Sequence, residues 1–85
     1  MLKYENVAEV GEVIKAYDFE PMQGRPDRFL IGTVTDKGKT PMGFAGYTVN
    51  VTESPYPLSD RVGDEMYVPF GIMGFDWDNR VSKVA

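Results

Sequence analysis

Glycine and proline recur along this chain at short intervals, and this spacing limits the length of any regular element. Nine glycines and six prolines are distributed over 85 residues, and both residue types interrupt helices and strands. The apolar segments between them are about five to ten residues long, which is typical of β-strands. We therefore expect a single domain, residues 1–85, that is mainly β.

The segment 46–53 carries the clearest strand pattern. Tyr47, Val49 and Val51 alternate with threonine and asparagine residues, which is the period of two that a half-buried strand shows. One face of this strand is expected to be buried and the other to contact solvent.

The segment 27–36 is a second expected strand, and it is apolar on both sides. Phe29 and Ile31 lie on one face and Leu30 on the other. This pattern indicates burial on both faces, or an edge strand that another subunit covers. Gly32 in the middle indicates a sharp bend or a bulge, which a small barrel needs in order to close.

The segment 64–70 is a third expected strand. Met66, Val68 and Phe70 point to one face. Pro69 has no amide hydrogen to donate, so this strand either ends there or lies at an edge of the sheet.

The remaining segments complete the expected fold. Residues 10–21 fit both a helical stripe and a strand, and their β-branched and aromatic side chains favour a strand. Residues 3–9 are expected to form a short helix before it, and residues 80–85 a last short strand. Five strands joined by glycine- and proline-containing turns predict a small, strongly bent antiparallel β-barrel. The alternative is an open antiparallel sheet with a helix across it.

The absence of cysteine and histidine bears on the possible kinds of site. Without them the chain lacks disulfides, the usual zinc ligands, the thiol nucleophile and the commonest general base. Asp76 and Asp78 resemble the start of a calcium loop, but the glycine and the glutamate that the full pattern requires are missing. We therefore predict a protein that is not an enzyme and has no cofactor and no metal site. Because so short a chain buries little surface, self-association is the expected source of added stability.

Charge and hydropathy bear on partners and location. The formal net charge is −4, which lowers the expectation of nucleic-acid binding without excluding a local basic patch. No apolar stretch approaches the roughly 18 residues that a membrane span needs, and the N-terminus shows no signal-peptide pattern. These features predict a cytoplasmic protein without a membrane partner.

A resemblance to a known family rests on two stretches, GEVIKAYDFEPMQGRPDRFLIGTVTDKG (11–38) and RVGDEMYVPFG (61–71). In overall pattern they resemble the Sm-like small β-barrels, in particular uncharacterised marine metagenome and cyanophage proteins. The resemblance implies a five-stranded, SH3-like barrel after an optional short helix, a homo-oligomeric ring, and a phage protein located in the cytoplasm of an infected bacterium. The glycine–asparagine and arginine–glycine signatures of true Sm proteins are absent, so no RNA-binding residue of that family is carried over.

Basic residues cluster in two connections. Arg25 and Arg28 flank the first, and Lys37 and Lys39 lie in the second. A straight strand would separate the two clusters by about 25–30 Å, and a strong bend would shorten that distance. Repeated around the rim of a ring, these charges would bind phosphates through avidity. The alternative is that they only keep the loops soluble.

The stretch FGIMGFDWDN (70–79) combines turn-forming residues with large apolar ones. Phe75 and Trp77 could fill the core, anchor a neighbouring subunit, or stack on nucleic-acid bases. The flanking carboxylates of Asp76 and Asp78 repel phosphates and weigh against stacking.

Taken with the resemblance, the sequence predicts a non-enzymatic, ring-forming homo-oligomer that binds single-stranded RNA or DNA. The expected contacts are Arg25, Arg28, Lys37, Lys39, Phe75 and Trp77. The alternative is a phage accessory or structural protein that binds only other proteins.

Overall fold

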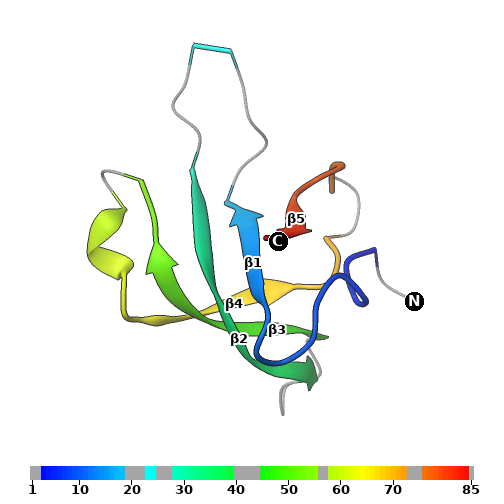
Figure 1. Ribbon diagram of the computed structural model, residues 1–85. Helices are drawn as coiled ribbons and strands as arrows, with labels where there is room; N and C mark the ends of the chain where they lie inside the picture. The colour runs from blue at the N-terminus through cyan, green and yellow to red at the C-terminus, as the bar shows by residue number, and fades with distance from the viewer. Residues whose placement is uncertain are drawn as a thin grey trace.

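The protein folds into one five-stranded antiparallel β-sheet. The computed structural model describes residues 3–18, 23–24, 28–39, 45–55, 58–72 and 76–84. The strands are β1 (Val13–Tyr17), β2 (Phe29–Lys39), β3 (Ala45–Glu53), β4 (Glu65–Pro69) and β5 (Val81–Lys83). They lie in the order β4-β3-β2-β1-β5 (Figure 1). Within the described residues the one helical element is a short 3₁₀ turn, Ser59–Arg61. The predicted mainly-β fold with five antiparallel strands is therefore confirmed.

β3 shows the alternation that the sequence predicts. Tyr47, Val49 and Val51 are buried, while Asn50 and Thr52 are exposed. The buried side chains of β3 form the centre of one hydrophobic core, which consists of Tyr4, Ala8, Ile14, Ala16, Leu30, Val34, Tyr47, Val49, Val51, Val68, Phe70 and Val81.

β2 lies between β1 and β3, so the alternative of an edge strand is wrong. Leu30 is buried, and Phe29 and Ile31 on the opposite face are half-buried. The irregularity expected at Gly32 is confirmed, because the register with β3 shifts between Ile31 and Gly32. A Cβ atom on Gly32 would lie 2.4 Å from the carbonyl oxygen of Asn50. Glycine is therefore what allows β2 and β3 to approach so closely at this position.

β4 and β5 are the two edges of the sheet. β4 ends at Pro69 and also lies at an edge, so both properties that the proline indicated are present. No backbone pairing joins β4 to β5 within the described ranges, and closure of the predicted barrel by a continuous ladder is not observed there. Instead Arg80, which immediately precedes β5, donates a 2.7 Å hydrogen bond from Nη2 to the carbonyl of Pro69. A side chain thus bridges the two edge strands.

The predicted N-terminal helix is wrong, because residues 3–6 form turns, residue 7 a bend, and residues 8–9 no regular structure. The reason is tertiary contact with the sheet. The amide of Tyr4 donates to the carbonyl of Phe70 at 2.7 Å, and the amides of Val7 and Ala8 donate to the hydroxyl of Tyr47 at 3.1 and 3.2 Å. Backbone groups of this segment are satisfied by the sheet, which leaves no need for helical hydrogen bonds.

The strands expected near the two ends of the chain are confirmed as β1 and β5. In β1, Ile14 and Ala16 face the core, while Lys15 and Tyr17 are half-buried on the outer face. In β5, Val81 is buried. Within the described residues, no helix has the length and apolarity that crossing a membrane requires.

Candidate nucleic-acid interface

The four basic residues expected to bind phosphate occupy different environments. Arg28 is exposed just before β2, and Lys37 is half-buried near the other end of that strand. Arg25 and the side chain of Lys39 lie outside the described part of the structure. Arg28 and Lys37 therefore lie towards opposite ends of β2.

Lys37 is already engaged by its neighbours. Its Nζ lies 2.9 Å from Glu9 Oε1 and 5.9 Å from the centre of the Tyr47 ring. The hydrogen bond to Glu9 raises the pKa of the Lys37 ammonium, so Lys37 is charged and its partner carboxylate offsets that charge. A phosphate at Lys37 would have to compete with Glu9.

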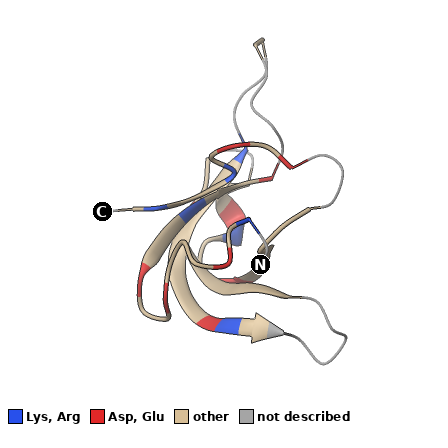
Figure 2. Ribbon diagram, turned by 90° about the vertical axis from the view of Figure 1, so that its right-hand side faces the viewer, with Lys and Arg blue, Asp and Glu red and all other residues tan. Residues whose placement is uncertain are grey.

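Positive and negative residues are interspersed along the ribbon (Figure 2). Arg61, for example, pairs with Asp18 at 2.8 Å. Lys15 and Arg28 differ, because neither forms an ion pair with any other described residue. These two cations are not neutralised by a contacting carboxylate in the described part of the chain.

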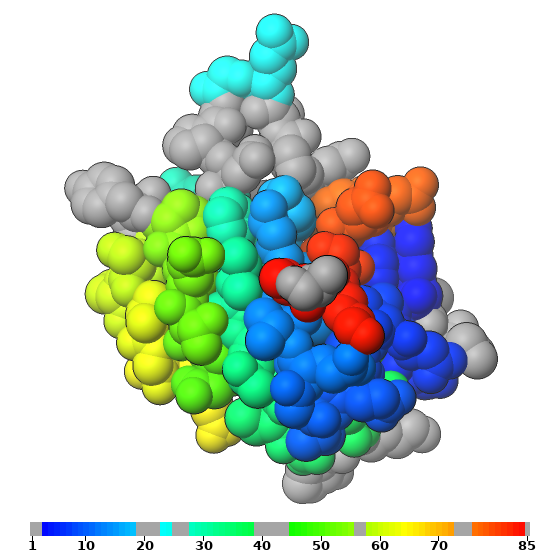
Figure 3. Space-filling model, viewed as in Figure 1, coloured from blue at the N-terminus to red at the C-terminus, as the bar shows by residue number. Residues whose placement is uncertain are grey.

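The outer face of β1 and β2 carries an aromatic and basic cluster that was not expected from the sequence. Tyr17 and Phe29 are paired across the two strands, with ring centres 5.8 Å apart. Lys15 Nζ lies 4.3 Å from the centre of the Phe29 ring and 5.1 Å from that of Tyr17. β1 (blue) and β2 (teal) lie side by side on the face turned to the viewer in Figure 3. Alternation alone places Lys15 and Tyr17 on one face, but only the register between strands places Phe29 beside them.

Trp77 is half-buried. Its indole Nε1 is buried and has no hydrogen-bond partner in the described part of the chain. A base could therefore reach only part of the Trp77 ring. Phe75, the other aromatic residue expected to stack, lies outside the described residues.

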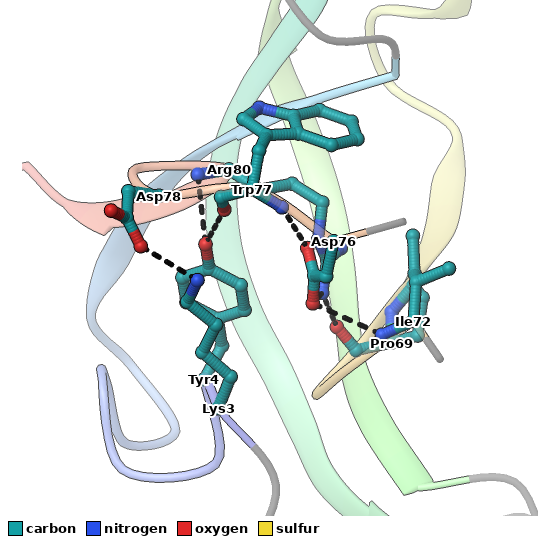
Figure 4. Close-up of polar contacts among 8 residues, drawn as sticks. All are labelled: Lys3, Tyr4, Pro69, Ile72, Asp76, Trp77, Asp78 and Arg80. Atoms are coloured by element: carbon teal, nitrogen blue, oxygen red, sulfur yellow. Dashed lines mark hydrogen bonds and ion pairs between the residues drawn. The ribbon is translucent and has the colours of Figure 1, made fainter. Parts of the chain in front are cut away.

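The segment 76–80 is organised around Arg80, which was also not singled out from the sequence (Figure 4). Its side chain is 2% exposed and pairs with Asp76, which is 10% exposed, at 2.7 Å between Nε and Oδ1. The Asp76 carboxylate also accepts the amides of Ile72 and Trp77 at 3.0 Å each. The lone sequence sign of this arrangement is a carboxylate four residues before an arginine, and that spacing has no fixed meaning outside a helix.

Asp76 remains ionised at neutral pH because its hydrogen bonds outweigh its burial. Burial raises the pKa of this carboxyl. The Arg80 guanidinium and the amides of Ile72 and Trp77 lower that pKa by a larger amount, so the pKa of Asp76 lies below its ordinary value. The carboxylate is therefore the partner that makes burial of the Arg80 charge tolerable.

Tyr4 fastens the N-terminal turns to this segment. Its hydroxyl donates to the carbonyl of Trp77 and accepts the amide of Arg80 at 3.1 Å. The Arg80 guanidinium lies 4.8 Å from the centre of the Tyr4 ring. Lys3 adds an exposed ion pair to Asp78 at 2.7 Å. The segment 76–80 is thus held mainly by contacts within the molecule.

Comparison of the chain with protein-family models, with curated proteins and with solved structures gives no match. The Sm-like resemblance therefore remains a hypothesis that rests on the overall sequence pattern.

Proposed function

We propose that this protein is a non-enzymatic module that assembles with copies of itself through its edge strands, and that the assembly binds single-stranded RNA or DNA. The observation that carries the proposal is that β4 and β5 are the edge strands of the sheet in one copy, with no further strand paired to either in the described part of the chain. The Sm-like resemblance supports a ring as the product.

On the outer side of β4, the carbonyl of Pro69 accepts a hydrogen bond from Arg80, while other backbone groups can pair with a further strand. The amide of Phe70 bonds to the carbonyl of Ala45, and antiparallel pairs alternate between bonded and non-bonded. Two residues before Phe70, Val68 is again in a hydrogen-bonded pair with β3. The backbone groups of Tyr67, one residue earlier, therefore point away from β3. Such unpaired groups form a template for another strand.

The open side of β5 is complementary. The amide of Val84 bonds to the carbonyl of Val13, so the backbone groups of Lys83 point away from β1. Tyr67 of β4 is 41% exposed and Val84, next to β5, is 40% exposed, so each edge also offers apolar surface. Pairing β4 of one copy with β5 of the next is head-to-tail, which generates a ring if the rotation closes and a filament if it does not.

Lys83→Pro is expected to abolish assembly, whereas Lys83→Ala is expected to preserve it. Both variants lose the exposed ion pair between Lys83 and Glu12, and only proline removes the edge-facing amide. Sedimentation velocity over a range of protein concentrations measures the mass of each variant, and far-UV circular dichroism checks that both fold. A monomeric wild-type protein at every concentration would contradict the assembly, as would identical masses for the two variants.

The nucleic-acid half of the proposal rests on the resemblance and on the basic positions Arg25, Arg28, Lys37 and Lys39. Alanine at all four positions is expected to weaken binding of labelled oligo-dT and oligo-U and to reduce the salt slope of log K by about 3. Fluorescence anisotropy at several salt concentrations measures both quantities. An unchanged affinity and salt slope would show that these residues do not contact the ligand.

A module that binds only protein is the second candidate. The pairing of Lys37 with Glu9 favours it, because the carboxylate competes with any phosphate at that cation. It predicts the same assembly with no oligonucleotide affinity even at low salt.

A further inference from the structure

We infer that the outer face of β1 and β2, around Lys15, Tyr17 and Phe29, is a stacking platform for single-stranded nucleic acid. This inference rests on the nucleic-acid half of the proposed function. It assigns the stacking role to a different place from the loop that contains Phe75 and Trp77.

The two rings lie next to each other on one face of the sheet, and each is accessible in part. Tyr17 and Phe29 lie on adjacent strands in direct register, and both are half-buried on the outer face of the sheet. Their planes are inclined by 57°, so the two rings are not stacked face to face on one another. Neighbouring bases of a flexible single strand can use such inclined aromatic surfaces one after the other.

The charge beside the rings is suited to phosphate. Lys15 Nζ lies against both rings and forms no ion pair with a described carboxylate. In the described part of the chain, the ammonium is held by its cation–π contacts with these two rings. Rotation of its flexible stem would bring it to a phosphate and uncover the rings for a base.

Among the described residues around the rings, carboxylates do not outnumber cations, and Asp18 is paired with Arg61. Arg28 directly precedes Phe29 and is exposed, and Glu53 faces Ile31 on β3. Farther along the face, Glu12 is paired with Lys83 at 2.6 Å. Although the protein as a whole is acidic, the region around the two rings would offer cations beside aromatic side chains to single-stranded nucleic acid.

The test compares variants that keep or remove the rings. Tyr17→Leu and Phe29→Leu are each expected to weaken oligo-dT binding about 5- to 100-fold, whereas Tyr17→Phe and Phe29→Tyr keep a ring and are expected to bind like the wild type. Lys15→Gln is expected to reduce the salt slope by about 0.7. Anisotropy of the labelled oligonucleotide measures affinity, and photo-crosslinking with 5-iodouracil DNA identifies the contacted peptide.

The outcomes separate this inference from the proposed function. If the wild type binds and both leucine variants bind equally well, or if crosslinks map to the peptide with Trp77, the platform is wrong while nucleic-acid binding stands. If the wild type does not bind at low salt, both fail. Lys15→Gln changes one partly exposed side chain. If a leucine variant fails to fold, an unchanged salt slope for Lys15→Gln would contradict the platform.

Discussion

Asp76→Ala is expected to lower the free energy of unfolding by about 3–5 kcal/mol, because it leaves the buried Arg80 guanidinium without its counter-charge. Arg80 is 2% exposed, so water cannot replace the lost carboxylate. The amides of Ile72 and Trp77 lose their acceptor at the same time. Urea denaturation at neutral pH, followed by far-UV circular dichroism, measures the change.

Asp78→Ala is the matched control. Asp78 forms an ion pair of the same 2.7 Å length with Lys3, but the Asp78 side chain is 90% exposed and that of Lys3 43%. Removal of an exposed pair of this kind costs less than about 1 kcal/mol. Equal losses for the two variants would contradict the role assigned to burial of Arg80.

The same pair makes stability depend on pH with a definite sign. The pKa of Asp76 in the folded protein lies below its ordinary value, so the folded state favours the ionised carboxylate. This contribution is fully present above the unfolded pKa of about 4 and is lost as the pH falls through the folded pKa. The wild type should therefore lose more stability than Asp76→Asn between neutral pH and about pH 3, and an equal loss would argue against the linkage.

Tyr47→Phe is expected to lower the free energy of unfolding by about 2–3 kcal/mol while leaving the core volume almost unchanged. The Tyr47 hydroxyl donates to the carbonyl of Tyr4 and accepts the amides of Val7 and Ala8. Its loss leaves these buried or half-buried backbone groups unsatisfied, and each such group costs about 1–3 kcal/mol when water cannot reach it. Partial solvation of the loosened N-terminal turns keeps the total below the full sum.

Two further measurements define this result. Amide hydrogen exchange should show that protection is lost first in residues 4–8, because Tyr47 is what holds them to the sheet. Tyr67→Phe removes a hydroxyl from a side chain that is 41% exposed and should change stability by less than about 0.5 kcal/mol. An unfolding free energy for Tyr47→Phe equal to that of Tyr67→Phe would show that the buried hydroxyl is dispensable.

The strands were predictable because their pattern is local. Alternation in β3 identified Tyr47 and Val49 as buried, and the same reasoning located β4 with Pro69 at its end. Gly32 indicated the irregularity in β2, since a glycine inside a strand pattern usually marks a bulge or a close backbone approach. Both effects act within a few residues, so the sequence alone contains them.

The absence of the N-terminal helix and the surroundings of the basic side chains could not be predicted in this way. Residues 3–9 have no helix because Tyr47, some 40 positions later, binds their backbone. The expected basic residue Lys37 is paired with Glu9, 28 positions away. Arg80 and Lys15 were not singled out from the sequence, because their partners come from other segments of the chain.

The sequence by itself determined a mainly-β domain of short strands without cysteine or histidine chemistry, because periodicity, turn residues and composition act locally. The tertiary structure alone decided which charge is buried, which is neutralised and which lies beside aromatic rings. Those outcomes depend on register and contact between distant segments. Arg80 at Pro69 and Asp76, and Lys15 at Phe29, are the clearest cases, since the position of each charge is set by where the other strands lie.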